Sequence, residues 1–313
     1  MKLKLFGLLH IKEGEITSVN LSVKSFKEQI STYLDMSSNL YRSLQTRGVD
    51  FTLITNRKDF VESMLSSAGS DMPVVEIDFS TKPPTGKQFF SAHFKLDVFR
   101  YLASLNEQYV GLCDLDMICI NDFPKCLKNM VESQIPMFYD ISDQVMGRRE
   151  AIIRDLESIH HLKSEGRWAG GEFIAGPPEF FKNLAQETEN LYDNYLSIIE
   201  EVNHVGDETV TSAALEVIRR KGIYICDAGT LGVVGRYWGG ASSRFIQKPL
   251  RYFENCFLLH LPSSKAFLAN LQIDGVFSST EFKKKYRVYR LGESMKSFVR
   301  RQIVRKRKKR VVH

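Results

Sequence analysis

The chain has 313 residues, a net charge of +6 and 43% hydrophobic residues, so it is long enough to bury a large core. No run of roughly 18 apolar residues is present, so the sequence predicts no membrane-spanning helix. The apolar part of Met1–His10 is too short for a signal peptide and lacks a small-residue cleavage site, and we expect a first buried strand there. Five cysteines without a Cys-x-x-Cys spacing indicate reduced thiols in a cytoplasmic protein.

The beginning of the chain has the pattern of an α/β protein. A strand from Leu3, a long helix around Leu21 to Arg47 and a strand at Phe51 to Ile54 form a βα unit that begins a parallel sheet. A third short strand follows at Val74 to Ile77. These elements predict that the chain begins with the first strands and the first helix of an α/β domain.

An apolar strand within residues 108–122 ends in two aspartates one residue apart, Asp114 and Asp116. Side chains at positions i and i+2 of an extended segment point the same way. At the carboxyl end of a buried strand they lie where open α/β sheets bind ligands, and their oxygens can hold a hard divalent cation. Such a cation would clamp a diphosphate. A helix predicted between Phe90 and Leu105 precedes this strand and carries Lys95.

The second half of the chain contains shorter predicted elements. In order, they are a strand at Met137–Tyr139, a charged helix at Arg148–Lys163, an apolar strand within 167–178, a loop and helix at 203–220, an apolar strand at 256–260 and a link at 266–280. We find no internal repeat, no Walker-type phosphate loop and no metal-finger cysteine spacing.

The helix with Lys95, the strand that ends in Asp114 and Asp116, and the order of the later elements resemble the nucleotide-sugar glycosyltransferases with the GT-A fold. The similarity is to the glycogenin-like and bacterial lipooligosaccharide galactosyltransferases, and it covers residues 1–265. It implies an α/β fold with a single GT-A, Rossmann-like domain and a mixed, mostly parallel central sheet. The nucleotide-binding half would be about residues 1–122 and the acceptor half about residues 123–265. Residues 266–313 would form a linker and a basic amphipathic helical tail.

The resemblance also implies which residues bind the donor. Lys95 matches a basic residue that reaches the donor. Ala169 and Gly170 match the small residues of a stretch that lines the sugar pocket, although Trp168 stands where the family has asparagine. Lys265 matches a lysine that contacts the diphosphate.

A metal site is implied in the same way. His260, at the end of an apolar strand, matches the third protein ligand of the metal, beside Asp114 and Asp116. An imidazole with two carboxylates suits Mn²⁺, with Mg²⁺ as the alternative. The ion would neutralise charge on the leaving nucleotide. A buried core histidine is the competing interpretation of His260.

Three carboxylates are candidates for catalysis. Glu172 directly follows a glycine pair and would point into a cleft if that turn is exposed. Asp207 matches an aspartate that opens a helix beneath the donor sugar, and it is also well placed as a helix N-cap. Glu208 replaces the family's glutamine, which faces the anomeric carbon in retaining members, so it would be a nucleophile, a base or a surface charge. The resemblance points to retention, while each carboxylate is a possible base for inversion.

The resemblance therefore predicts a metal-dependent glycosyltransferase that uses a nucleotide-sugar donor, by analogy a UDP-sugar. The acceptor would be a glycan or glycolipid in bacterial surface polysaccharide synthesis. A sugar-phosphate nucleotidyltransferase shares the sheet and the metal carboxylates. It would need a glycine-rich basic loop after the first strand, which Leu8 to Gly14 do not supply.

The charge is distributed unevenly along the chain. Residues 283–313 hold fourteen Lys or Arg against one Glu, a local charge of +13, and the other 282 residues carry −7. Met295, Phe298, Val299, Ile303 and Val304 recur near helical spacing within this tail. We expect a basic amphipathic helix that attaches the protein to the anionic inner face of the cytoplasmic membrane. A nucleic-acid-binding tail and a solvated disordered end are the alternatives, and the acidic body argues against nucleic acid.

Overall fold

A computed structural model describes residues 2–15, 21, 23–86, 90–239, 246–273 and 275–311, with side chains described up to residue 296. The described chain forms two compact units, Met1–Val276 and Phe277–His313. Four of the apolar tail positions predicted to share a helix face, Phe298, Val299, Ile303 and Val304, have side chains outside the described residues.

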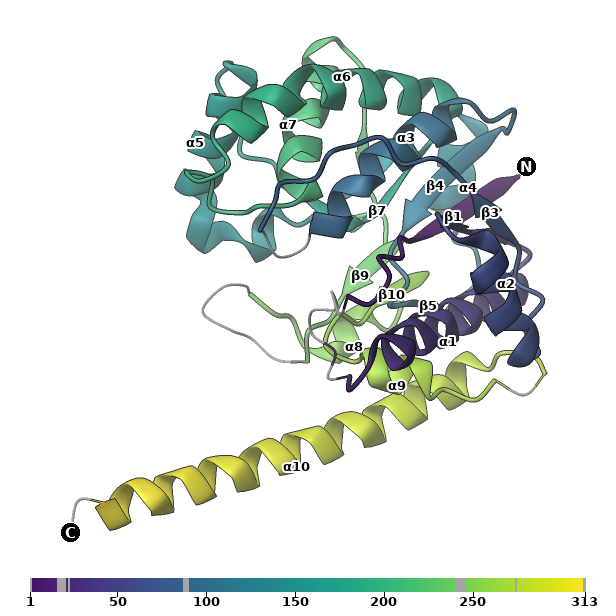
Figure 1. The fold of residues 1–313 in the computed structure, drawn as a ribbon, viewed down its shortest axis with the longest axis vertical. Coiled ribbons are helices and arrows are strands. Elements are labelled where there is room, and N and C mark those ends of the chain that lie inside the picture. The colour runs from purple at the N-terminus through teal and green to yellow at the C-terminus, as the bar shows by residue number, and fades with distance from the viewer. Residues whose placement is uncertain are drawn as a thin grey trace. The chain divides into compact units, whose positions relative to one another are not determined.

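Seven of the described strands form the main sheet, in the order β3-β2-β1-β4-β7-β6-β8 (Figure 1). Neighbouring strands run parallel except on both sides of β7, which is antiparallel to β4 and β6. The α/β class and the mixed, mostly parallel sheet are thus confirmed, and the topology is compatible with a Rossmann-like domain. The strands are β1 Leu3–Leu9, β2 Asp50–Thr55, β3 Val74–Glu76, β4 Tyr109–Cys113, β6 Met137–Asp140, β7 Ala169–Gly176 and β8 Cys226–Asp227.

A smaller sheet, formed within the described residues by three strands, has the order β5-β10-β9. Its strands are β5 Met117–Cys119, β9 Val234–Arg236 and β10 Leu258–His260. The segment predicted as one strand across residues 108–122 is therefore two strands in two sheets. The two aspartates lie in the connection between them, because β4 ends at Cys113 and β5 begins at Met117.

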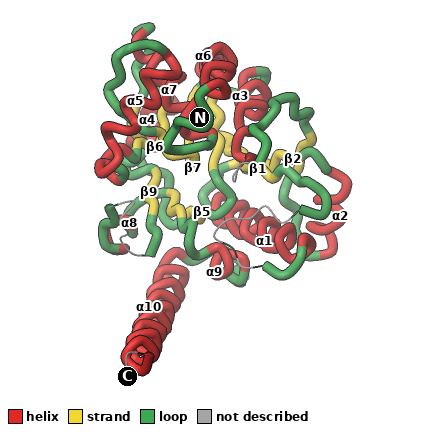
Figure 2. The backbone as a smooth tube through the Cα atoms, turned by 60° about the vertical axis from the view of Figure 1, so that its left-hand side comes forward, coloured by secondary structure: helices red, strands yellow, loops and turns green. Residues whose placement is uncertain are grey.

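Helices cover both faces of the main sheet, with α1 and α2 on one face and α3, α6 and α7 on the other (Figures 1 and 2). The central strand β1 lies between β2 and β4, and the side chains of Leu5 and Phe6 are buried. Burial on both faces explains its nearly continuous apolar sequence. The first unit's helices are α1 Phe26–Gln45, α2 Lys58–Ser67, α3 Lys95–Ala103, α4 Lys125–Glu132, α5 Arg149–His160, α6 Pro178–Ser197, α7 Asp207–Arg220, α8 Leu250–Phe253 and α9 Lys265–Ala269.

Local structure moves the start of two predicted helices, through a capping side chain in one and a 3₁₀ turn in the other. The long helix α1 begins at Phe26 because Ser25 is its N-cap and its hydroxyl accepts the Glu28 N–H at 3.1 Å. A 3₁₀ turn at Phe90–Phe94 precedes α3, which places Lys95 at the first position of the α-helix.

The second unit contains helix α10, Ser279–Val311. Among the described residues, no helix is both long enough and apolar enough to cross a membrane.

Candidate metal and ligand site

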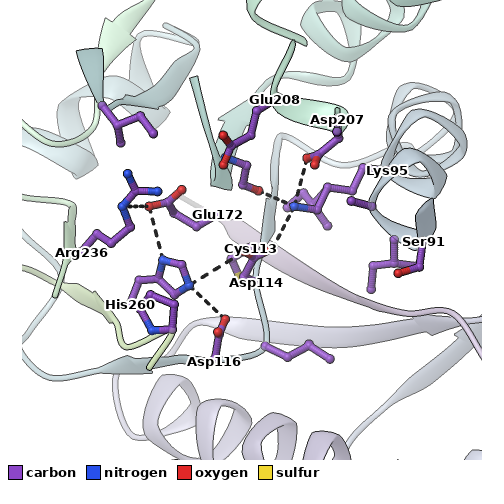
Figure 3. Close-up of a pocket in the computed structure, with 18 of the residues that line it drawn as sticks. Ser91, Lys95, Cys113, Asp114, Asp116, Glu172, Asp207, Glu208, Arg236 and His260 are labelled. Carbon is purple, nitrogen blue, oxygen red and sulfur yellow. Dashed lines mark hydrogen bonds and ion pairs between the residues drawn. The ribbon is translucent and has the colours of Figure 1, made fainter. Parts of the chain in front are cut away.

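A cavity of about 440 Å³ opens at the carboxyl ends of β1 and β4. The start of α3, the middle of β7, the start of α7 and the ends of β9 and β10 contribute to its lining, together with residues of α1, α5 and α9 (Figure 3). This is the edge of a parallel sheet at which α/β proteins commonly bind ligands.

The connection from β4 to β5 aims Asp114 and Asp116 into this cavity. Leu115, between them, is buried against β1 at Gly7, where a β-carbon would overlap the Leu115 side chain. The connection from Cys113 to Met117 is a bend, and Asp114, Leu115 and Asp116 all contribute to the cavity lining. The glycine in β1 therefore makes room for the turn that places the two aspartates, and both line the cavity.

His260 reaches the aspartates through the small sheet. Strand β10 pairs antiparallel with β5, which puts His260 opposite Met117. The His260 Nε2 atom lies 3.0 Å from Asp116 Oδ1 and 3.9 Å from Asp114 Oδ2. One ligand atom from each of the three side chains lies within 4.8 Å of the others, a spacing that could hold a metal ion. Two carboxylates and an imidazole fit Mn²⁺ or a similar divalent cation.

Neighbouring opposite charges shift the pKa values of Asp116 and His260. Burial alone would raise the pKa of Asp116, but Lys265 and His260 outweigh it and hold that pKa well below its usual range. Burial would lower the pKa of His260, yet the Asp116 carboxylate raises it to about 9. The ammonium of Lys265 forms an ion pair with Asp116 Oδ2. The positive charges of His260 and Lys265 therefore balance the negative charge of the Asp116 carboxylate.

Lys95 connects the aspartate pair to the start of α7. Its Nζ lies 2.7 Å from the Gly171 carbonyl oxygen, 2.9 Å from Asp114 Oδ1 and 3.1 Å from Asp207 Oδ2. Burial lowers the pKa of an ammonium, but the two carboxylates outweigh it and raise the pKa of Lys95. The N-cap of α7 is Gly206, so the predicted capping role of Asp207 is wrong. Its carboxylate is buried and paired with Lys95.

Glu208, the next residue of α7, presents its carboxylate to the cavity between several N–H donors. The Trp168 indole Nε1–H donates to Oε2 at 2.9 Å, and the Gly171 backbone N–H donates to Oε1 at 3.3 Å. His204 Nε2 lies 3.5 Å from Oε2. The side chain is 21% exposed, so it remains accessible to a bound molecule.

Glu172 is more deeply buried, at 1% exposure. Its Oε1 lies 3.3 Å from His260 Nδ1 and 3.4 Å from Arg236 Nε. Burial would raise the pKa of Glu172, but Arg236 and then His260 lower it to about 2. Glu172 lines the cavity, next to His260.

The cavity brings together all but two of the predicted site residues. Those that line it are Lys95, Asp114, Asp116, Glu172, Asp207, Glu208, His260 and Lys265. Ala169 and Gly170 do not, which corrects the expectation that they line a sugar pocket. Ala169 is buried with its N–H bonded to Ser212 Oγ, and Gly170 lies against the Glu172 carboxylate.

Most of the lining residues were not predicted, and Arg236 and His10 are two of them. Arg236 is the last residue of the short strand β9, and one basic residue in an apolar strand has no distinguishing spacing. His10 follows β1 and stacks on Phe94 with ring centroids 3.8 Å apart. Burial lowers the pKa of His10 to about 4, so this ring is a neutral aromatic surface at neutral pH.

Comparison of the sequence with protein-family models and with curated proteins finds no match.

Proposed function

We propose that this protein is a metal-dependent glycosyltransferase with a GT-A domain, which moves a sugar from a nucleotide-sugar donor to a glycan or glycolipid. The observation that carries the proposal is the position of Asp114, Asp116 and His260 within 4.8 Å of one another, at the carboxyl end of β4. The cavity they line has a volume in the range of small-molecule sites. A UDP-linked donor and bacterial surface polysaccharide are the expected chemistry by resemblance.

Each group near the aspartates has a part in this proposal. Asp114, Asp116 and His260 would hold Mn²⁺ or Mg²⁺, which when bound neutralises negative charge on the leaving diphosphate. Lys95 and Lys265 are ammonium groups beside those carboxylates and would add donors for phosphate oxygens. Positive charge fixed where negative charge develops lowers the barrier to departure of the nucleotide.

Glu208 is the carboxylate best supported as the group that faces the anomeric carbon. Its two oxygens accept N–H bonds from Trp168 and Gly171, so the carboxylate has a fixed orientation. Asp207 is paired with Lys95 instead, and Glu172 is 1% exposed. In a retaining reaction Glu208 would form and then release a glycosyl ester, and in an inverting one it would take the acceptor's proton.

Donor hydrolysis measured across UDP-sugars, with and without Mn²⁺, tests the function. Asp116→Asn should lower metal-dependent turnover by orders of magnitude. Asp122→Asn is a matched control, because it makes the same change on a 94% exposed side chain. Metal-independent turnover, or equal rates in both variants, would contradict the proposal. Pyrophosphate release from a nucleoside triphosphate and a sugar phosphate would support a nucleotidyltransferase instead.

Glu208→Gln separates the catalytic assignments. It should abolish transfer, while the anomeric configuration of the wild-type product, read by NMR, distinguishes retention from inversion. Asp207→Asn is the comparison on the adjacent residue. If Glu208→Gln transfers at the wild-type rate, another carboxylate has this role.

We also propose that α10 attaches the protein to an anionic membrane surface. Val288, Leu291 and Met295 are each at least 66% exposed and fall at positions i, i+3 and i+7 of the helix, so they share one face. The surrounding basic residues would bind anionic headgroups at about 1 kcal/mol each. Replacing the three apolar residues with serine should weaken binding to phosphatidylserine vesicles at low salt. Tight nucleic-acid binding without vesicle binding would overturn this assignment.

A further inference from the structure

Glu172 lies against the candidate metal ligand His260 on the side away from the aspartates. The two nitrogens of the imidazole face different partners, as Figure 3 shows. Nε2 is 3.0 Å from Asp116 Oδ1, and Nδ1 is 3.3 Å from Glu172 Oε1. Metal-bound histidines commonly donate their second N–H to a carboxylate, which fixes the tautomer and the ring orientation.

We propose that Glu172 is a positioning residue for metal binding, which holds His260 with Nδ1–H toward its own carboxylate and Nε2 toward the ion. The inference rests on the metal site of the proposed function. It assigns Glu172 a role through His260, in place of direct contact with the acceptor, because a side chain with 1% exposure offers little surface to an acceptor hydroxyl.

Arg236 stabilises the buried carboxylate from the other side. Its Nε lies 3.4 Å from the same Glu172 oxygen and donates to Gln144 Oε1 at 3.1 Å. The Arg236 backbone N–H donates to the Tyr139 hydroxyl at 3.2 Å. An isolated buried carboxylate would be costly, so Arg236 permits an ionised Glu172 to remain beside the imidazole.

Gly170 provides the space that Glu172 occupies. A β-carbon at this position would overlap Glu172 Oε2 and come within 2.9 Å of its Cδ. The Gly170 backbone lies outside the left-handed region, so alanine would cause no backbone strain, and its β-carbon would meet Ile141 Cγ2 at 3.0 Å besides the Glu172 carboxylate. Gly170→Ala should therefore push the carboxylate away from His260 while every charge of the site is kept.

The test is the affinity for Mn²⁺ alone, measured by electron paramagnetic resonance of free Mn²⁺ on the full chain. Glu172→Gln and Gly170→Ala should each weaken binding by about 10- to 100-fold, the usual effect of losing such a partner. Neither change should weaken binding further in a His260→Ala background, because both act through the imidazole. Thermal melts of each apo protein report whether the fold survives.

Glu216→Gln is the matched control. Glu216 is also buried and accepts from a histidine, His160 Nε2, at 3.0 Å, but it does not line the cavity. This variant should lose stability and keep wild-type Mn²⁺ affinity.

The outcomes separate the two proposals. If His260→Ala loses Mn²⁺ affinity while Glu172→Gln and Gly170→Ala both match the wild type, the role of Glu172 is overturned and the metal site stands. If Glu172→Gln weakens binding equally with and without His260, Glu172 does not act through the imidazole. If the wild type binds no Mn²⁺, or His260→Ala binds it as tightly, the metal site fails and the positioning role fails with it.

Discussion

Asp116→Asn should destabilise the metal-free protein, because Asp116 neutralises two buried cations. Its carboxylate is 3.0 Å from His260 Nε2 and is paired with Lys265, and its side chain is 5% exposed. The asparagine side chain keeps the size and removes the charge. His260 can respond by losing its proton, whereas Lys265, 12% exposed, is left as a mostly buried ammonium without this counter-charge.

Removing one partner of a buried ion pair costs about 3–5 kcal/mol. Because Lys265 is partly exposed and His260 can lose its proton, we expect a loss of folding free energy at the lower end of this range, about 3 kcal/mol. At about 2.1 cal/mol/K of unfolding entropy per residue, each kcal/mol lowers the melting temperature of a chain of this size by roughly 1.5 °C, so a fall of about 4–5 °C is expected. Lys265→Met, which removes the orphaned charge, should restore most of this loss in the double variant.

The assay is thermal and urea denaturation at pH 7 in chelator-treated buffer, because a bound ion would stabilise the wild type selectively. Asp78→Asn controls for the chemical change on an exposed residue. A loss below about 1 kcal/mol for Asp116→Asn would refute the charge network inferred around it, since that is the scale of a surface pair. The charge network would also be refuted if the double variant, Asp116→Asn with Lys265→Met, were less stable than Asp116→Asn alone.

Three further predictions concern the cavity. The affinity for Mn²⁺ should rise about tenfold per pH unit from about pH 6.5 to about pH 9 and then level off, as calorimetry across pH would measure. The reason is that His260, whose pKa is raised to about 9, must lose its proton before it can bind the ion. Gly171→Ala should lower the affinity for the donor nucleotide, because the added β-carbon would lie 2.8 Å from Asp207 Oδ2. Titration with UDP measures this affinity, and an unchanged value would contradict the prediction. Trp168→Phe removes the indole donor to Glu208 and should lower kcat about 10- to 100-fold with KM little changed, which steady-state kinetics would check.

The elements with strong local patterns could be predicted from the sequence. The strand from Leu3, the helix ending near Arg47 and the strand at Phe51 depend on hydrophobic periodicity within short windows, and the structure confirms them. The break between Cys113 and Met117 could not be predicted, because β5 pairs with β10 and the contact of Asp116 with His260 spans 144 positions. No local pattern reports such a distant pairing.

The site residues divide in the same way. Asp114, Asp116 and His260 carry chemistry in their residue types, so they could be proposed before their positions were known. Arg236 could not, because its importance comes from its contact with the buried carboxylate of Glu172, which belongs to another strand. The glycine pair indicated close packing, but the sequence could not show which atoms fill the space.

Gly170 and Gly171 lie at an irregularity in β7, and each contacts a different group of charged residues in the cavity. Pairing with β6 passes from Ile174 to Gly170, so the intervening residues leave that ladder, as a bulge does. The freed N–H of Gly171 donates to Glu208, and its carbonyl accepts from Lys95. Next to it, Gly170 leaves the space for Glu172. A side chain at either glycine would thus disturb a different set of charges, and glycines within an apolar strand are the sequence signal for such a bulge.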